Sequence, residues 1–263
     1  MRTYAAILLL AALAASGCGK PHHIDLDAQY VNPERMAKGL VIILPGIEGE
    51  SDANRGIRKG LKDGAVPYAL AIYRWGFPVP GLGLLMNQTD TAGDRRAGAD
   101  LAKGIARYQQ KHPGCPVFLV GHSAGGGVAV FALEALADLP DAKPVTGAIL
   151  LSSSISAGYS LEKALRMSRC GIVNGYNPDD TALLGAGTAI FGNVDGDHGD
   201  SAGRTGFHQT DPRLFQFKIS SADPGVTGDP HFIVTDASLI AKHAPRWILT
   251  ESWPPPRRVA SAR

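Results

Sequence analysis

Residues 116–137 read PVFLVGHSAGGGVAVFALEALA, and this stretch decides the fold. An apolar run typical of a buried strand, Pro116 to Val120, leads into Gly121-His122-Ser123-Ala124-Gly125, and an apolar helix is predicted from Gly126 to Ala137. Side chains at positions 121 and 125 would collide with the strand and helix that flank a tight turn. The stretch predicts a strained Ser123 at the carboxyl edge of a sheet, beside a helix N-terminus that favours negative charge. A glycine-rich turn with a capping serine is the alternative interpretation.

Strand-length apolar runs alternate with helical patterns along the rest of the chain. Nearly continuous apolar strands are typical of parallel sheets covered by helices on both faces. The pattern therefore predicts an α/β fold with a doubly wound, mostly parallel sheet in one domain, residues 38–263. The other strands are expected within 40–44, 66–73, 147–151, 171–173 and 214–219, and the other helices within 94–111, 160–167 and 238–249.

The Gly-His-Ser-Ala-Gly turn in its strand-turn-helix context resembles the nucleophile turn of the α/β-hydrolase family, and the resemblance covers residues 38–250. It implies that Ser123 is a nucleophile and that two backbone N–H groups form an oxyanion hole. One donor would be Ala124 and the other Ile47, in the loop that follows the strand 40–44. The family commonly has His before the glycine of that loop, whereas this chain has Pro45, which leaves the backbone donor intact. Such donors stabilise the developing oxyanion by several kcal/mol.

The resemblance also implies a base and an acid in the chain order Ser, acid, His. His231 lies between the last expected strand and the last expected helix, where the family places its base. His198 and His208 are the reserve candidates, and His243 falls inside an expected helix. The remaining histidines precede Ser123 or lie within its turn: His22, His23, His112 and His122.

The acid is expected after the strand 171–173, where the family usually carries it. Tyr176, Asn177, Asp180 and Leu183 match a recurring family pattern, which favours Asp180 and leaves Asp179 as the alternative. The acid would orient His231 and stabilise its imidazolium without taking the proton itself.

Two segments bear on the substrate. Residues 155–170 are too few for a large cap domain between the neighbouring strands, whereas the apolar loop 74–86 could line an acyl-chain groove or simply pack against the next helix. The insertion 184–207 holds carboxylates and a histidine, but its spacing matches no EF-hand loop. No Rossmann motif, P-loop or spaced Cys/His set occurs, so the sequence predicts no cofactor and no metal.

The first residues resemble a bacterial lipoprotein signal. Arg2 precedes an apolar run too short to span a bilayer, and Ala15-Ser16-Gly17 stands directly before Cys18. This pattern predicts a signal peptide over 1–17, lipidation of Cys18, a tether over 18–37 and an exported protein anchored to a bacterial membrane, with its catalytic domain in the periplasm or outside the cell. An ordinary secretory peptide with an incidental Cys18 is the alternative.

Composition excludes other classes. With 26 basic and 24 acidic residues the formal charge is +2, so a nucleic-acid partner is not expected, and 44% hydrophobic residues exclude a disordered chain. Cys115 and Cys170 precede strands that a third strand should separate, which predicts two free thiols.

Together these features predict a membrane-anchored serine hydrolase that cleaves carboxylic esters or thioesters through an acyl-Ser123 intermediate. Its expected partners are a small-molecule or lipid ester and the membrane. The alternatives are a binding or scaffold lipoprotein with a degenerate site and an acyltransferase that uses the same triad.

Overall fold

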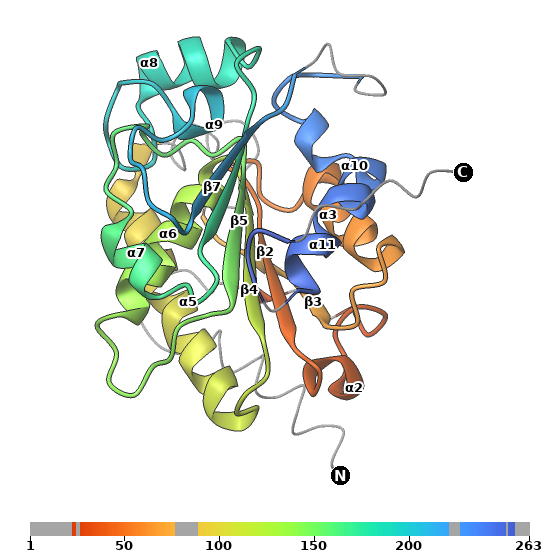
Figure 1. Cartoon of the computed structure of the whole chain (residues 1–263). Helices are drawn as coiled ribbons and strands as arrows, with labels where there is room; N and C mark the ends of the chain where they lie inside the picture. Colours follow the sequence, from red (N-terminus) through yellow and green to blue (C-terminus); the bar gives the residue numbers. More distant parts are fainter. Residues whose placement is uncertain (1–22, 25–26, 77–88, 221–226, 251, 256–263) are drawn as a thin grey trace.

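The computed structural model describes residues 23–24, 27–76, 89–220, 227–250 and 252–255. The expected signal peptide, Cys18 and most of the 74–86 loop lie outside these residues. The described chain forms a seven-stranded sheet in the order β1-β3-β2-β4-β5-β6-β7 (Figure 1). The strands are β1 (His23–Ile24), β2 (Leu40–Leu44), β3 (Ala69–Arg74), β4 (Val117–His122), β5 (Gly147–Leu151), β6 (Ile172–Tyr176) and β7 (Leu214–Lys218).

Six strands run parallel, and only β1 is antiparallel, pairing with β3 at the edge of the sheet. The residues of β2, β4 and β5 are all buried, because helices cover both faces of the sheet. The predicted α/β fold with a mostly parallel sheet and no large cap domain is therefore confirmed.

Helices form a layer on each face (Figure 1). On one face α5 (Thr91–Lys111), α6 (Ala124–Leu136) and α7 (Glu162–Arg166) close one hydrophobic core. On the other face α3 (Asp52–Asp63), α10 (Ala237–His243) and α11 (Pro245–Ile248) close a second core. Shorter elements complete the fold: α2 (Pro33–Met36), the π-helix η2 (Ala182–Gly187), α8 (Thr188–Phe191), α9 (Ala202–Thr205) and the 3₁₀-helix η3 (Ile233–Thr235). No helix in the described ranges is long and apolar enough to cross a bilayer.

Three parts of the fold differ from the sequence expectations. Helix α3 was not predicted, because its polar sequence offers only Ile57 and Leu61 as buried aliphatic side chains. The helix expected over 238–249 is divided between α10 and α11, since Pro245 has no N–H to continue the first helix. The strand expected over 66–73 begins only at Ala69.

The described part of the expected tether belongs to the fold. His23 and Ile24 pair with Arg74 and Tyr73 of β3. Val31 and Met36 are 7% and 5% exposed, so this segment is packed into the core before β2 begins.

The two described cysteines, Cys115 and Cys170, are free, as predicted. Cys115 precedes β4 and Cys170 precedes β6, and β5 lies between these two strands, as expected.

Candidate active site

Ser123 occupies a sharp turn between β4 and α6. Its φ of 54° and ψ of −127° are strained for a residue with a side chain, and it is 6% exposed. A Cβ added to Gly121 would lie 2.5 Å from the Gly125 carbonyl oxygen, and one added to Gly125 would lie 2.3 Å from the Leu44 oxygen. Only glycine permits these approaches, so the predicted requirement for small residues at both positions follows from the packing.

The loop after β2 lies against this turn. A Cβ added to Gly46 would come within 3.0 Å of the Ser123 Cβ, and Ile47, the expected oxyanion donor, follows directly. The indole Nε1 of Trp75 donates a hydrogen bond of 2.9 Å to the Pro45 carbonyl. Trp75 belongs to the segment considered for an acyl-chain groove, yet its side chain is 6% exposed and instead holds the loop that carries Ile47. The other expected donor, Ala124, is the first residue of α6.

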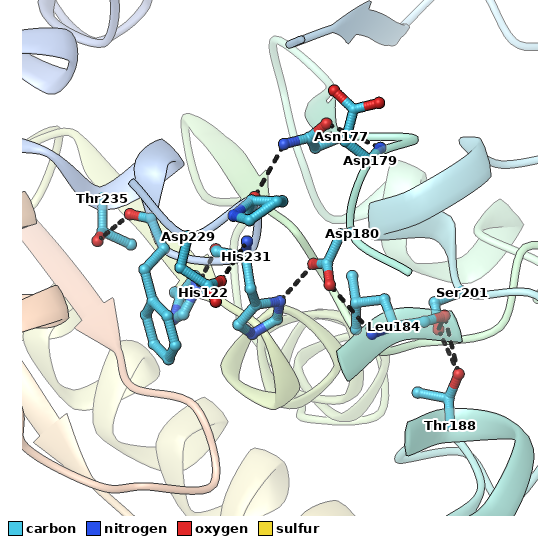
Figure 2. Close-up of polar contacts among 12 residues, drawn as sticks. His122, Asn177, Asp179, Asp180, Leu184, Thr188, Ser201, Asp229, His231 and Thr235 are labelled. Atoms are coloured by element: carbon cyan, nitrogen blue, oxygen red, sulfur yellow. Dashed lines mark hydrogen bonds and ion pairs between the residues drawn. The ribbon is translucent and has the colours of Figure 1, made fainter. Parts of the chain in front are cut away.

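Asp180 and His231 form a buried pair. The Nδ1 atom of His231 lies 2.5 Å from Oδ2 of Asp180, and the two side chains are 4% and 2% exposed (Figure 2). The other carboxylate oxygen of Asp180 accepts a hydrogen bond from the backbone N–H of Leu184. Asp179, the alternative acid, is exposed, and its carboxylate accepts a hydrogen bond from the Ser220 hydroxyl instead. The geometry therefore favours Asp180 as the partner of His231.

The backbone around His231 is held from three sides (Figure 2). The N–H of His231 donates to Asp229 at 2.8 Å, and its carbonyl accepts from Nε2 of His122 at 3.1 Å. The preceding carbonyl, of Pro230, accepts from the side chain of Asn177 at 2.9 Å. Sequence reasoning assigned no such role to His122 or Asn177, because both contacts join segments far apart in the chain.

His122 connects the nucleophile turn to the His231 loop. It precedes Ser123, is fully buried, and its ring centroid lies 4.8 Å from that of His231. Its Nδ1 is 3.9 Å from the carboxylate of Glu48, in the loop after β2. Ser123 and His231 are both described, and the hydroxyl of Ser123 forms no hydrogen bond to the ring of His231. Such contacts are often long in unliganded enzymes and tighten when substrate binds.

Burial has the largest effect on the pKa of His231. Loss of solvation lowers the pKa of His231 below its ordinary 6.5, and the hydrogen bond that its Nδ1 donates to Asp180 offsets this only in part. The charge on His122 lowers the pKa of His231 further, and the charge on Glu48 raises it. For Glu48 itself, burial would raise the pKa, but interactions with His122 and the Ser51 hydroxyl bring it below the ordinary value. At neutral pH the imidazole of His231 is therefore neutral and lies near the ionised carboxylate of Glu48.

A groove of about 650 Å³ lies between the loop after β2 and the segment that contains His231, although His231 itself does not line it. Glu48 lines it from the loop after β2, and Asp229 and Phe232 line it from the two sides of His231 in the chain. Asp52 and Asp236 also line it, and none of the described residues in its lining is basic.

The reserve histidines lie elsewhere. His198, His208 and His243 are all exposed, and none contacts Asp180. Within the insertion, Asp195 accepts hydrogen bonds from the backbone and hydroxyl of Ser156, which fixes the insertion to the chain after β5. In the described part of the chain no group of three His, Cys, Asp or Glu side chains is placed to hold a metal ion.

Comparison with known proteins defines the fold. No protein-family model matches the chain. No curated protein matches it in sequence either. Among solved structures, dienelactone hydrolase from Anabaena variabilis is 14% identical and has a TM-score of 0.52, with 90% of this chain and 94% of that chain covered. Est1E from Butyrivibrio proteoclasticus, solved with ferulic acid bound, is also 14% identical, with a TM-score of 0.50 and coverage of 87% and 95%. The chain has the α/β-hydrolase fold.

Proposed function

We propose that this protein is a serine hydrolase of carboxylic esters or thioesters, with Ser123 as nucleophile, His231 as general base and Asp180 as the acid that orients it. The observation that carries the proposal is the buried contact of 2.5 Å between Asp180 and His231, in a loop that His122 joins to the strained Ser123 turn. The solved relatives named above support a hydrolase because one is a dienelactone hydrolase.

In the proposed reaction His231 Nε2 takes the proton of the Ser123 hydroxyl as its oxygen attacks the ester carbonyl. The negative charge that develops on the carbonyl oxygen is stabilised by the N–H groups of Ile47 and Ala124. The imidazolium then protonates the leaving alcohol or thiol, and the acyl group stays on Ser123. Water attacks the acyl-serine with His231 again as base, which releases the acid and restores the hydroxyl. Asp180 stays ionised throughout and stabilises the imidazolium.

A fluorophosphonate probe tests this chemistry directly, because it reacts only with an activated serine. We expect covalent labelling at Ser123 in the folded protein and hydrolysis of short p-nitrophenyl esters, with both lost in Ser123→Ala. Heat-denatured protein should not be labelled. Unlabelled folded protein, or ester hydrolysis that survives Ser123→Ala, would contradict the proposal.

We further propose that the protein is anchored to a bacterial membrane through lipidated Cys18. Support comes from the sequence alone: the short apolar run, the small residues before Cys18 and its place just ahead of the folded domain. One acyl chain gives only marginal membrane binding, so stable anchoring would need the several acyl chains that lipoproteins of this kind carry.

A further inference from the structure

The segment 181–191 exposes an apolar surface. Residues 181–194 read TALLGAGTAIFGNV, without a charged side chain. Leu183, Ile190 and Phe191 are 45%, 66% and 44% exposed, whereas Leu184 and Thr188 point inward with exposures of 2% and 3%. Two short helices, η2 and α8, therefore bury one side and present apolar side chains to solvent. We call this surface, formed by the outward side chains of residues 181–191, the apolar surface. Contiguous apolar exposure of this kind marks interaction sites.

The apolar surface lies at the edge of the sheet that carries the active site. Helix η2 follows β6 directly after Asp180, and the N–H of Leu184 binds the Asp180 carboxylate. In Figure 1, α8 lies at the top of the molecule and α2 at the bottom, at opposite ends of the strands. Whatever covers the apolar surface would therefore lie at the same edge of the sheet as the candidate active site.

The described chain enters the fold at this same edge. His23 pairs with Arg74, the last residue of β3, so β1 starts at the carboxyl end of the parallel strands. Cys18 is five residues earlier, and five residues reach at most about 18 Å when fully extended. Strand β6 is five steps from β1 in the sheet, or about 24 Å. An anchor at Cys18 would therefore hold the carboxyl end of β3, at one side of this edge, close to the bilayer.

We propose that the apolar surface docks on the membrane to which Cys18 anchors the protein, so that the active site faces the lipid. This inference rests on the proposed membrane anchoring and commits to a lipid surface as the occupant. The surface carries no charge and the whole chain only +2, so contact would come from apolar burial at the interface and not from attraction to anionic lipids. A site held in this way would draw lipophilic or lipid esters from the bilayer.

Site-specific fluorescence in the full-length, lipidated protein tests the orientation. An environment-sensitive dye would be attached at Ile190→Cys or, as the matched control, at Glu34→Cys in α2, whose side chain is 79% exposed at the opposite end of the sheet. Both variants carry Cys115→Ser and Cys170→Ser. The vesicles consist of phosphatidylethanolamine and phosphatidylglycerol, and some lipids carry a quencher on the acyl chain. For the dye at residue 190 we expect a blue shift of the emission and strong quenching by these lipids. For the dye at residue 34 we expect neither effect.

Equal quenching at the two positions, or quenching at position 34 alone, would overturn the proposal. A blue shift at position 190 that persists without lipid and grows with protein concentration would assign the surface to a second copy of the chain. Protein that fails to sediment with the vesicles would remove the anchor and the docking with it. Fluorophosphonate labelling of Ser123 in the same samples separates the two ideas, because it reports the hydrolase chemistry whether or not the dye enters lipid.

Discussion

His231 is fixed more firmly than a surface histidine could be. Its Nδ1 contacts Asp180, its N–H binds Asp229 and its carbonyl accepts from His122. With Nδ1 engaged as the donor to a carboxylate, Nε2 is the ring nitrogen that can accept a proton. The contacts therefore determine both the tautomer and the orientation that a general base requires.

Replacement of Asp180 tests this orientation. Asp180→Asn keeps the shape of the side chain but removes the charge that holds Nδ1 as the donor, so we expect kcat/KM for a p-nitrophenyl ester to fall by about 10³–10⁴-fold. Asp179→Asn is the matched control, since the exposed Asp179 carboxylate contacts Ser220, and it should leave kcat/KM close to the wild-type value. The assignment of the acid would be reversed if Asp179→Asn were the inactive variant.

The pH profile depends on Glu48. Burial keeps the pKa of His231 below 6.5. As the pH is lowered, we therefore expect kcat/KM to stay constant until the pH is below 6.5, and to fall only where His231 becomes protonated, which is the acid limb of the profile. The charge on Glu48 raises the pKa of His231, and Glu48→Gln should therefore shift the acid limb to lower pH.

Asp52→Asn provides the control for Glu48→Gln. It removes the same charge from a fully exposed side chain on α3, and its acid limb should stay in place. An acid limb that moves to higher pH in Glu48→Gln, or that moves equally in both variants, would contradict the role given to Glu48.

At the scale of elements, β4 and α6 were predictable because their local sequence is decisive. The continuous apolar run and the glycines around Ser123 allow few alternatives, and the observed bounds, Val117–His122 and Ala124–Leu136, agree with the prediction within two residues. Helix α3 shows the opposite case. Its residues are amphipathic at the helical period, but Ile57 and Leu61 are its only buried aliphatic side chains, and it packs against α10, nearly 180 residues later in the chain.

Helix α5 carries a buried carboxyl group outside the active site. Asp94 is 2% exposed, and its Oδ2 has no hydrogen-bond partner. Burial, with a smaller contribution from Asp90, raises the pKa of Asp94 to about 8 from 3.8. The folded protein thus keeps a proton that the unfolded chain releases, and its free energy of unfolding should fall as pH rises from about 4 to about 8.

Asp94→Asn should remove this dependence. We expect the variant to be more stable than the wild type at pH 7, by a difference on the order of 2–4 kcal/mol, and equally stable near pH 4. Urea unfolding at several pH values measures the difference. Asp100→Asn, on the same helix but paired with Lys103 at the surface, should retain the wild-type slope. A loss of stability in Asp94→Asn at pH 7 would show that the ionised carboxylate is favoured.

At the scale of the whole molecule, the carboxyl edge of the sheet gathers every feature that bears on function. The Ser123 turn, the loop after β2 and the Asp180 segment follow parallel strands, whose ends meet at one edge. The apolar surface and the entry of the chain at His23 lie along the same edge. The membrane orientation proposed above follows from this arrangement, since an anchor near one edge of a rigid sheet constrains which end faces the lipid.

The sequence by itself determined the α/β class and indicated the strained serine turn, because both depend on residues close together in the chain, whereas the choice of His231 came from the family's chain order of Ser, acid and His. The expected lipid anchor also rests on a local pattern. Only the tertiary structure distinguishes the two candidate acids, because it places Asp180 buried against the His231 ring and Asp179 exposed, which favours Asp180. It also revealed the contacts of His122, Glu48 and Asn177 around His231, which join segments brought together only by folding.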